Sequence, residues 1–120
     1  MENSNRVLKF RAWSNSKKIW SEVFDLHHIP VAVLCKGIGF EDLEIVQFTG
    51  LKDRNGRGIF EGDIVKTEGF DDECIAEVIF KNGMFVDKFY SHAIGERVDY
   101  QLEVIGNVYE NPELLEEKPK

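Results

Sequence analysis

The chain has 120 residues, 42% of them hydrophobic and 31% charged, a composition typical of one globular domain with a core of its own. No apolar run approaches the ~20 residues that a membrane-spanning helix needs. The N-terminus lacks the apolar segment of a signal peptide, so we expect a cytoplasmic protein.

The formal net charge of −7 is unevenly distributed along the chain. Residues 1–60 hold 9 Lys and Arg against 7 Asp and Glu, whereas residues 61–120 hold 6 against 15. An acidic second half disfavours contact of that half with a phosphate backbone. It fits either a solvated surface that keeps the protein in solution or a face that docks on a basic partner.

The first half begins with two segments that have the pattern of strands. Arg6–Trp13 alternates between apolar and basic residues, which predicts a half-buried strand. Ser14–Lys17 is typical of a turn, and Ile19–Leu26 is rich in aromatic and β-branched residues, so the two strands are expected to form a hairpin. Residues 27–43 are less regular, and we expect a short strand or an irregular crossover there.

The middle of the chain holds two strand-like segments, Glu44–Thr49 and Ile59–Thr67, around a loop rich in glycine. Asn55-Gly56 is a strong turn signal, because both residues tolerate the left-handed conformation. Glu61-Gly62-Asp63 predicts a tight turn in which Asp63 accepts hydrogen bonds from nearby amides. The loop glycines are expected to guide the backbone along a specific path; they are Gly50, Gly56, Gly58 and Gly62.

The second half continues with short strands. Glu73–Phe80 is followed by a two-residue hairpin turn at Asn82-Gly83 and a strand at Met84–Val86. Residues 87–97 are expected to form a loop, and Val98–Val104 alternates again, with Gly106 at a bulge or bend. Asn111 is predicted to cap a short helical turn, with Pro112 at its first position.

About seven short strands with almost no amphipathic helix predict a mainly β fold. We expect antiparallel strands in a strongly bent sheet or a small SH3-like barrel, followed by a short C-terminal helical turn. Within a single domain spanning residues 1–120, the pattern divides into an N-terminal β segment over 6–45, a barrel-like module over 46–110 and the helical turn over 111–117.

Four segments together resemble the YopX family, which is found in phages and prophages of Gram-positive bacteria. They are Lys9–Trp13, Gln47–Asp53 with Asn55-Gly56, Phe60–Val65, and Glu103–Leu115. The resemblance implies a β-rich, self-associating phage protein and supplies no catalytic residue. This chain departs from the family pattern at Ser14, where relatives usually carry an acidic residue, and at Gly58, where they often carry a charged one. It also has an extension over residues 1–5 that relatives lack. The positions that we assign to the structural motif are Phe48, Gly50, Asp53, Asn55, Gly56, Gly62, Asp63, Gly106, Asn111 and Pro112.

Two groups of residues that include carboxylate side chains could support chemistry. Glu61 and Asp63 could work as an acid–base pair or bind a divalent cation, but no third ligand or base follows at a recognisable spacing, so a turn capped by Asp63 is favoured. Asp53, Asn55 and Gly56 partly match a calcium-binding loop, but a liganding position is missing, and a simple turn is favoured.

The histidines and cysteines offer no motif of their own. His27, His28 and His92 lack a neighbouring carboxylate motif and are interpreted as loop or surface residues. Cys35 and Cys74 have no CxxC partner and are interpreted as small buried residues. No serine has the spacing of a nucleophile motif. We therefore predict no catalytic residue, no metal and no cofactor.

Basic and aromatic residues alternate near the N-terminus, which makes this segment the best candidate for a surface that binds nucleic acid or another partner. Aromatic rings beside Arg and Lys can stack and hold a single strand. The alternative is that the aromatic residues are core and the basic ones are solvated. The candidate residues are Lys9, Arg11, Trp13, Lys18 and Trp20.

The sequence favours a non-enzymatic module that forms a homo-oligomer and serves in binding or as a scaffold. Single-stranded nucleic-acid binding through the N-terminal strand is the second hypothesis. Inhibition of a host protein through the acidic half is the third. No membrane partner is expected.

Overall fold

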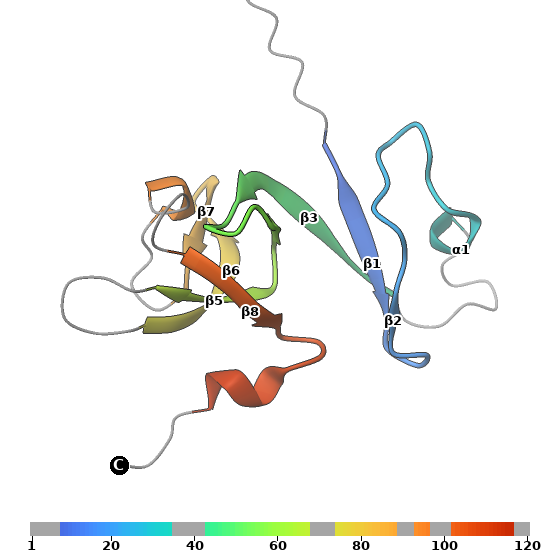
Figure 1. Cartoon of the computed structure of the whole chain (residues 1–120). Coiled ribbons are helices and arrows are strands. Elements are labelled where there is room, and N and C mark those ends of the chain that lie inside the picture. Colours follow the sequence, from blue (N-terminus) through green and yellow to red (C-terminus); the bar gives the residue numbers. More distant parts are fainter. Residues whose placement is uncertain (1–7, 35–42, 68–73, 89–92, 97–101, 117–120) are drawn as a thin grey trace, which may run out of the picture. The chain divides into compact units, whose positions relative to one another are not determined.

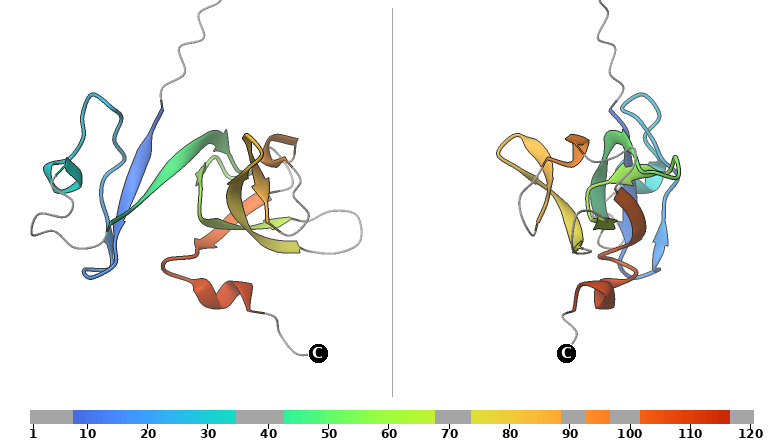
Figure 2. Two further views of the ribbon diagram at one scale, coloured as in Figure 1. Left: turned by 180° about the vertical axis from the view of Figure 1, so that it is seen from behind. Right: turned by 60° about the vertical axis from the view of Figure 1, so that its left-hand side comes forward.

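The structure, a computed structural model, describes residues 8–34, 43–67, 74–88, 93–96 and 102–116. These residues form eight strands in two four-stranded sheets, with one short α-helix and two 3₁₀ turns (Figure 1). The strand order is β2-β1-β3-β4 in the first sheet and β7-β6-β5-β8 in the second, which is strongly curled (Figure 2). The predicted mainly β fold is thus confirmed. The chain divides into two compact units, Met1–Phe48 (unit 1) and Thr49–Lys120 (unit 2).

Unit 1 is built on β1 (Phe10–Ser14), which pairs antiparallel with β2 (Ile19–Trp20) and with the first half of β3 (Leu43–Lys52). The registers include Ser14↔Ile19 and Ala12↔Ile45. Side chains directly opposite each other in an antiparallel pair point to the same face. Each face of this small sheet can therefore be assigned from the pairing.

Two predictions for unit 1 are wrong in part. The strand predicted over Ile19–Leu26 ends at Trp20, apart from one bridge between Phe10 and Phe24, because the Ser21 hydroxyl accepts the Ala12 amide at 2.9 Å and interrupts the backbone ladder. In the region expected to form a strand or crossover, Val31–Leu34 is a helical turn, α1. Pro30 starts this turn, since its carbonyl accepts the Val33 amide at 3.0 Å.

Unit 2 is centred on β5 (Asp63–Thr67), which lies between β6 (Cys74–Lys81) and β8 (Leu102–Asn107). The strand β7 (Met84–Asp87) pairs with β6, and β4 (Gly58–Phe60) neighbours the end of β3. The core cluster is apolar and branched, and Leu51 and Phe85 pack against it. Its members are Ile59, Val65, Val78, Ile94, Leu102 and Val104.

The turns of unit 2 follow the sequence closely. Lys81 pairs with Met84, so Asn82 and Gly83 form a two-residue turn, with φ values of 53° and 83°. The register between β5 and β8 shifts between Ile64 and Val65, opposite Gly106 and Val104, which places the expected bulge at this position. A 3₁₀ turn, η1, covers Ile94–Glu96 within the predicted loop.

The C-terminal turn forms as predicted, but its cap does not. The 3₁₀ turn η2 spans Pro112–Leu115 with Pro112 at its start. Among the residues that the structure describes, Asn111 makes no capping bond with its side chain. Its Oδ1 instead accepts the Asn107 amide at 3.2 Å, because Gly106 leaves room for the Asn111 side chain directly against the end of β8.

Some predictions lie outside the described residues: Cys35, His92, and the beginning of the strand predicted over 98–104. Cys74 begins β6. In the described part of the chain, no helix is long and apolar enough to cross a membrane.

Candidate functional site

Asp53 holds the central loop together from inside. Its side chain is buried, and Oδ1 accepts the amides of Asn55 and Arg57, both at 2.9 Å. Oδ2 accepts the amide of Val104 on β8, also at 2.9 Å. Burial raises the pKa of the Asp53 carboxyl, but these amide bonds outweigh burial and hold the pKa below its ordinary value of 3.8. All three donors are backbone amides, so the geometry is that of a structural anchor.

The Glu61-Gly62-Asp63 turn is braced in a similar way. Asp63 is 1% exposed, and its Oδ2 accepts the Phe60 amide at 2.8 Å. Gly62, at φ +90°, donates to the Val78 carbonyl at 2.9 Å and accepts the Val108 amide at 2.9 Å. Glu61 is half-buried. The turn thus connects three segments of unit 2, with one of its two carboxylates enclosed.

A second asparagine-based turn closes unit 2 at its C-terminal end. Asn107 is buried, and its Oδ1 accepts the amides of Tyr109 and Glu110 at 3.0 and 2.8 Å. Its Nδ2 donates to the Glu110 carboxylate at 2.8 Å. The sequence pattern did not lead us to predict this role for Asn107. The signal that could have found it is an Asn at the end of a strand, whose side chain can accept the backbone amides two and three residues further on.

The basic and aromatic candidates separate into three places. Arg11, Trp13 and Trp20 share one face of the unit 1 sheet. The Arg11 guanidinium lies 3.9 Å from the centre of the Trp20 ring, and the two indole rings are 5.1 Å apart. Trp13 is only 3% exposed, so little of its ring is accessible for stacking with a base. Lys18 lies in the turn before β2, with φ 60°.

Lys9 lies instead at an open pocket of about 410 Å³ in unit 1. The pocket combines charged and apolar side chains and is lined by Lys9, Glu22, Val23, Phe24, Asp25 and His28. Apart from the histidine, three charged side chains line the pocket, and two of them are acidic. The pocket therefore does not present a uniform positive field to a phosphate.

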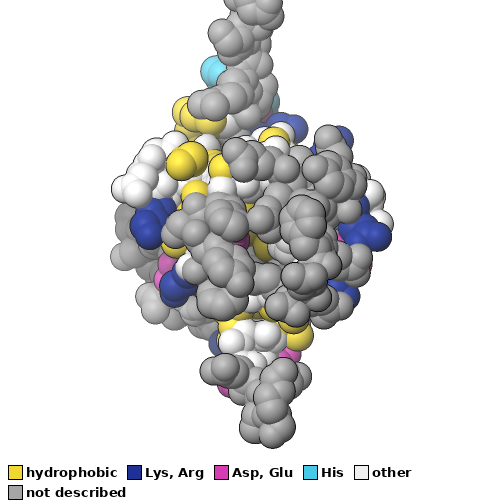
Figure 3. Space-filling model, turned by 90° about the vertical axis from the view of Figure 1, so that its left-hand side faces the viewer, with side chains coloured by type: hydrophobic (Ala, Val, Ile, Leu, Met, Phe, Trp, Pro, Cys, Tyr) yellow, Lys and Arg dark blue, Asp and Glu magenta, His cyan; other side chains and the backbone are white. Residues whose placement is uncertain are grey.

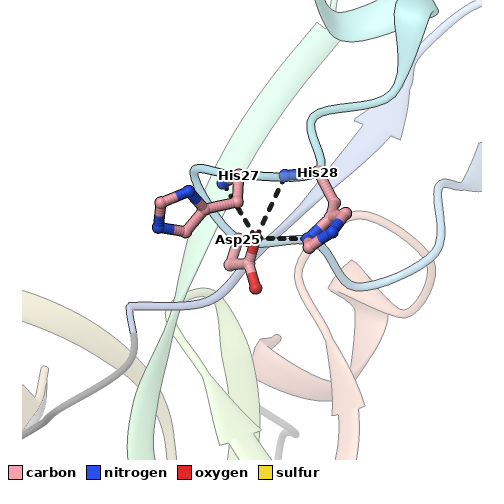
Figure 4. Close-up of polar contacts among 3 residues, drawn as sticks. All are labelled: Asp25, His27 and His28. Atoms are coloured by element: carbon pink, nitrogen blue, oxygen red, sulfur yellow. Dashed lines mark hydrogen bonds and ion pairs between the residues drawn. The ribbon is translucent and has the colours of Figure 1, made fainter.

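His27 and His28 are organised by Asp25, which the sequence analysis did not single out (Figure 4). Asp25 Oδ1 accepts the His27 and His28 amides at 2.9 and 3.1 Å, and lies 3.1 Å from His28 Nδ1. The His28 side chain and then the His27 amide hold the pKa of Asp25 below its ordinary value. The His28 side chain is 83% exposed. In the residues that the structure describes, no group of three or more His, Cys, Asp or Glu side chains could hold a metal ion.

Large apolar side chains remain at the surface of both units, as Figure 3 shows for one face of the molecule. In unit 1, the registers place Ile19, Leu43 and Ile45 on the same face of the sheet, opposite to the face of Arg11 and Trp13. Ile19 is 57% exposed and Ile45 is 44% exposed, although both belong to strands. We call this side of the sheet, which carries the exposed Ile19 and Ile45 and the buried Leu43, the isoleucine face.

Comparisons with known proteins agree with this architecture. The profile of a family described as "YopX protein" matches residues 9–116. Among solved structures, protein EF1440 from Enterococcus faecalis is 28% identical, with a TM-score of 0.68 over 92% of this chain and 99% of that one. Protein yopX from Bacillus subtilis is also 28% identical, with a TM-score of 0.52 over 90% and 98% of the two chains. No curated protein matches the sequence.

Proposed function

The chain belongs to the YopX family, and we propose that it is a non-enzymatic module that binds a second copy of itself through the isoleucine face of unit 1. The motif residues support a structural role, because Asp53, Asp63 and Asn111 direct their side-chain oxygens to backbone amides. We also propose, as the resemblance implies, that it is encoded by a phage or prophage and acts in the cytoplasm of the host cell.

Exposed isoleucines within a sheet carry the argument for self-association. Burying an isoleucine side chain completely contributes about 1.5–3 kcal/mol, and roughly half of this remains to be gained at Ile19 and Ile45. A two-fold interface contains each residue twice, so the same side chains contribute on both copies. Leu43 lies on the same face but is only 9% exposed, so Ile19 and Ile45 supply the accessible apolar surface.

The distribution of charge favours a second copy as the occupant. The 48 residues of unit 1 contain six Lys and Arg and six Asp and Glu, whereas unit 2 carries the whole excess of seven negative charges. Two copies that meet through unit 1 bring neutral segments together. Contact through unit 2 would instead bring like charges together, which disfavours association.

Sedimentation equilibrium of the full chain tests the proposal. We expect a mass above that of the 13.8 kDa monomer at micromolar concentration. High salt should leave the association intact or strengthen it, since the proposed contact is apolar. A monomer at every concentration tested would contradict the proposal.

Single-stranded nucleic-acid binding is a second candidate, supported by the stacking of Arg11 on the half-buried Trp20 ring. Fluorescence anisotropy with labelled single-stranded DNA at low salt would test it. Binding should weaken steeply with salt and be lost on substitution Arg11→Glu, but survive Lys52→Glu, the control at an exposed position of unit 2. Absence of binding at low salt would remove this candidate.

A further inference from the structure

Unit 2 contains two Asn-Gly turns whose glycines have the same φ. Gly56 and Gly83 both have φ +83°, and in both places a side-chain carbon added to the glycine would meet nothing within 4 Å. Asn55 and Asn82 are both exposed. The two turns therefore present the same exposed dipeptide and can be compared within one chain, although Asn82 has a positive φ of 53° and Asn55 does not.

The turns differ in the hydrogen bonds of their backbone amides. The Gly56 amide donates to the Asp53 carbonyl at 2.9 Å, and the Asn55 amide donates to the Asp53 carboxylate at 2.9 Å. In the part of the chain that the structure describes, the Gly83 amide has no hydrogen-bond partner. This is as expected at the second central residue of a two-residue hairpin turn, whose amide points away from the ladder.

We propose that Asn82 is a site of spontaneous deamidation in the native protein and that Asn55 is protected from it. The Gly83 nitrogen, after losing its proton to a solvent base, attacks Cγ of Asn82. The new N–C bond closes a cyclic imide, and the side-chain nitrogen leaves as ammonia. Water then adds to either imide carbonyl and opens the ring, so the product is aspartate or isoaspartate and the co-reactant is water alone.

Asp53 accounts for the protection of Asn55 by binding the backbone amide of Gly56. Attack by the Gly56 nitrogen requires that its hydrogen bond to the Asp53 carbonyl first open, so the reaction is slowed by the equilibrium for this local opening. Gly83 is not subject to this restriction, because its amide has no hydrogen-bond partner among the described residues.

The reaction would alter the hairpin that joins β6 to β7. Either product adds a negative charge at the turn. Isoaspartate also adds a carbon to the backbone between Lys81 and Met84. These two residues are paired in the ladder, and their pairing requires a turn of two residues of normal length. The proposed modification would therefore loosen this end of the sheet as the protein ages.

The test is peptide mapping by mass spectrometry of the full chain, incubated in its native state at mildly alkaline pH. We expect the deamidated peptide containing Asn82 to form roughly tenfold faster than the one containing Asn55, since the hydrogen bond of the Gly56 amide must first open at Asn55. The same chain in concentrated denaturant is the control, where the two rates should become similar because Asp53 no longer holds its loop.

Each outcome bears on the proposal. A native ranking of Asn82 far above Asn55 that disappears in denaturant supports it. Equal rates in the native chain, or faster reaction at Asn55, would overturn it. Absence of product at Asn82 in the native chain, after the denatured chain has reacted completely, would overturn it as well. The substitution Asn82→Gln should abolish the modification at this turn while leaving that at Asn55 unchanged, which checks the assignment of the peptides.

Discussion

Asp53 and Val104 lie 51 positions apart in the sequence and are joined by a 2.9 Å hydrogen bond from the Val104 amide to the Asp53 carboxylate. Val104 is part of β8, a strand at the end of its sheet, with β5 on one side. The carboxylate therefore satisfies an amide that would otherwise lie at an open sheet edge. The Arg54 amide, which donates to the Leu102 carbonyl at 3.0 Å, extends the same contact.

The substitution Asp53→Asn is expected to destabilise unit 2 by roughly 2–4 kcal/mol, since an amide can accept with one oxygen only and places its NH₂ group against a backbone donor. Urea unfolding followed by circular dichroism measures the change. The matched control is Asp25→Asn, at a carboxylate that also accepts two backbone amides but lies in an exposed turn. Equal, small effects of the two substitutions would contradict the anchoring role of Asp53.

The pH dependence of stability follows from the same carboxylate. The pKa of Asp53 is lower in the folded chain than its ordinary value of 3.8, so its stabilisation is complete above that ordinary value. The contribution is lost as the pH falls through the lower folded pKa. The difference in unfolding free energy between the wild type and Asp53→Asn should therefore be constant near neutral pH and shrink in strong acid. A difference that grows with acid would have the wrong sign.

Gly106 marks a position where a side chain cannot be accommodated without movement. A carbon added there would lie 2.6 Å from Asn111 Oδ1 and 2.9 Å from Leu114 Cδ1. We expect Gly106→Ala to cost about 1–3 kcal/mol through overpacking and disturbance of the bond from Asn107 to Asn111. Chemical denaturation measures this cost. Gly95→Ala is the control, since its added carbon would meet only Leu51 Cδ1 at 3.7 Å, and it should cost less.

The two tryptophans of unit 1 should differ strongly when truncated. Trp13 is 3% exposed, so Trp13→Ala is expected to cost about 3–5 kcal/mol. Trp20 is half-buried, so Trp20→Ala should cost clearly less, although it also removes the stack with Arg11. Because both tryptophans of the chain lie in unit 1, the fluorescence of the remaining one reports its unfolding in each variant. Equal losses would contradict the assignment of Trp13 to the interior.

Local patterns in the sequence were enough to predict the turns and most strands. The turns at Asn55-Gly56 and Asn82-Gly83 are determined by residues that tolerate positive φ, so near neighbours decide them. The same is true of Asp63, whose partner amide at Phe60 lies three residues away. The alternation in β1 likewise predicted which of its residues share a face.

Features that depend on distant residues could not be predicted in this way. The bond of Asp53 to Val104 requires the fold to be known, and so does the space at Gly106 that draws Asn111 away from a capping position. Alternation alone also could not separate Trp13, which is buried, from Ile45, which is exposed, because both fit a strand equally well. Val31–Leu34 was misjudged because a single helical turn is too short to show a helical period.

The central claim is self-association through the isoleucine face, and sedimentation velocity of two matched variants tests it most directly. Ile45 and Ile75 are 44% and 40% exposed, but only Ile45 belongs to this face. We predict that Ile45→Lys weakens association roughly 10–100-fold, because a two-fold interface contains the change twice, and that Ile75→Lys leaves the association of the wild type unchanged. Dissociation by Ile75→Lys with no effect of Ile45→Lys would contradict the account.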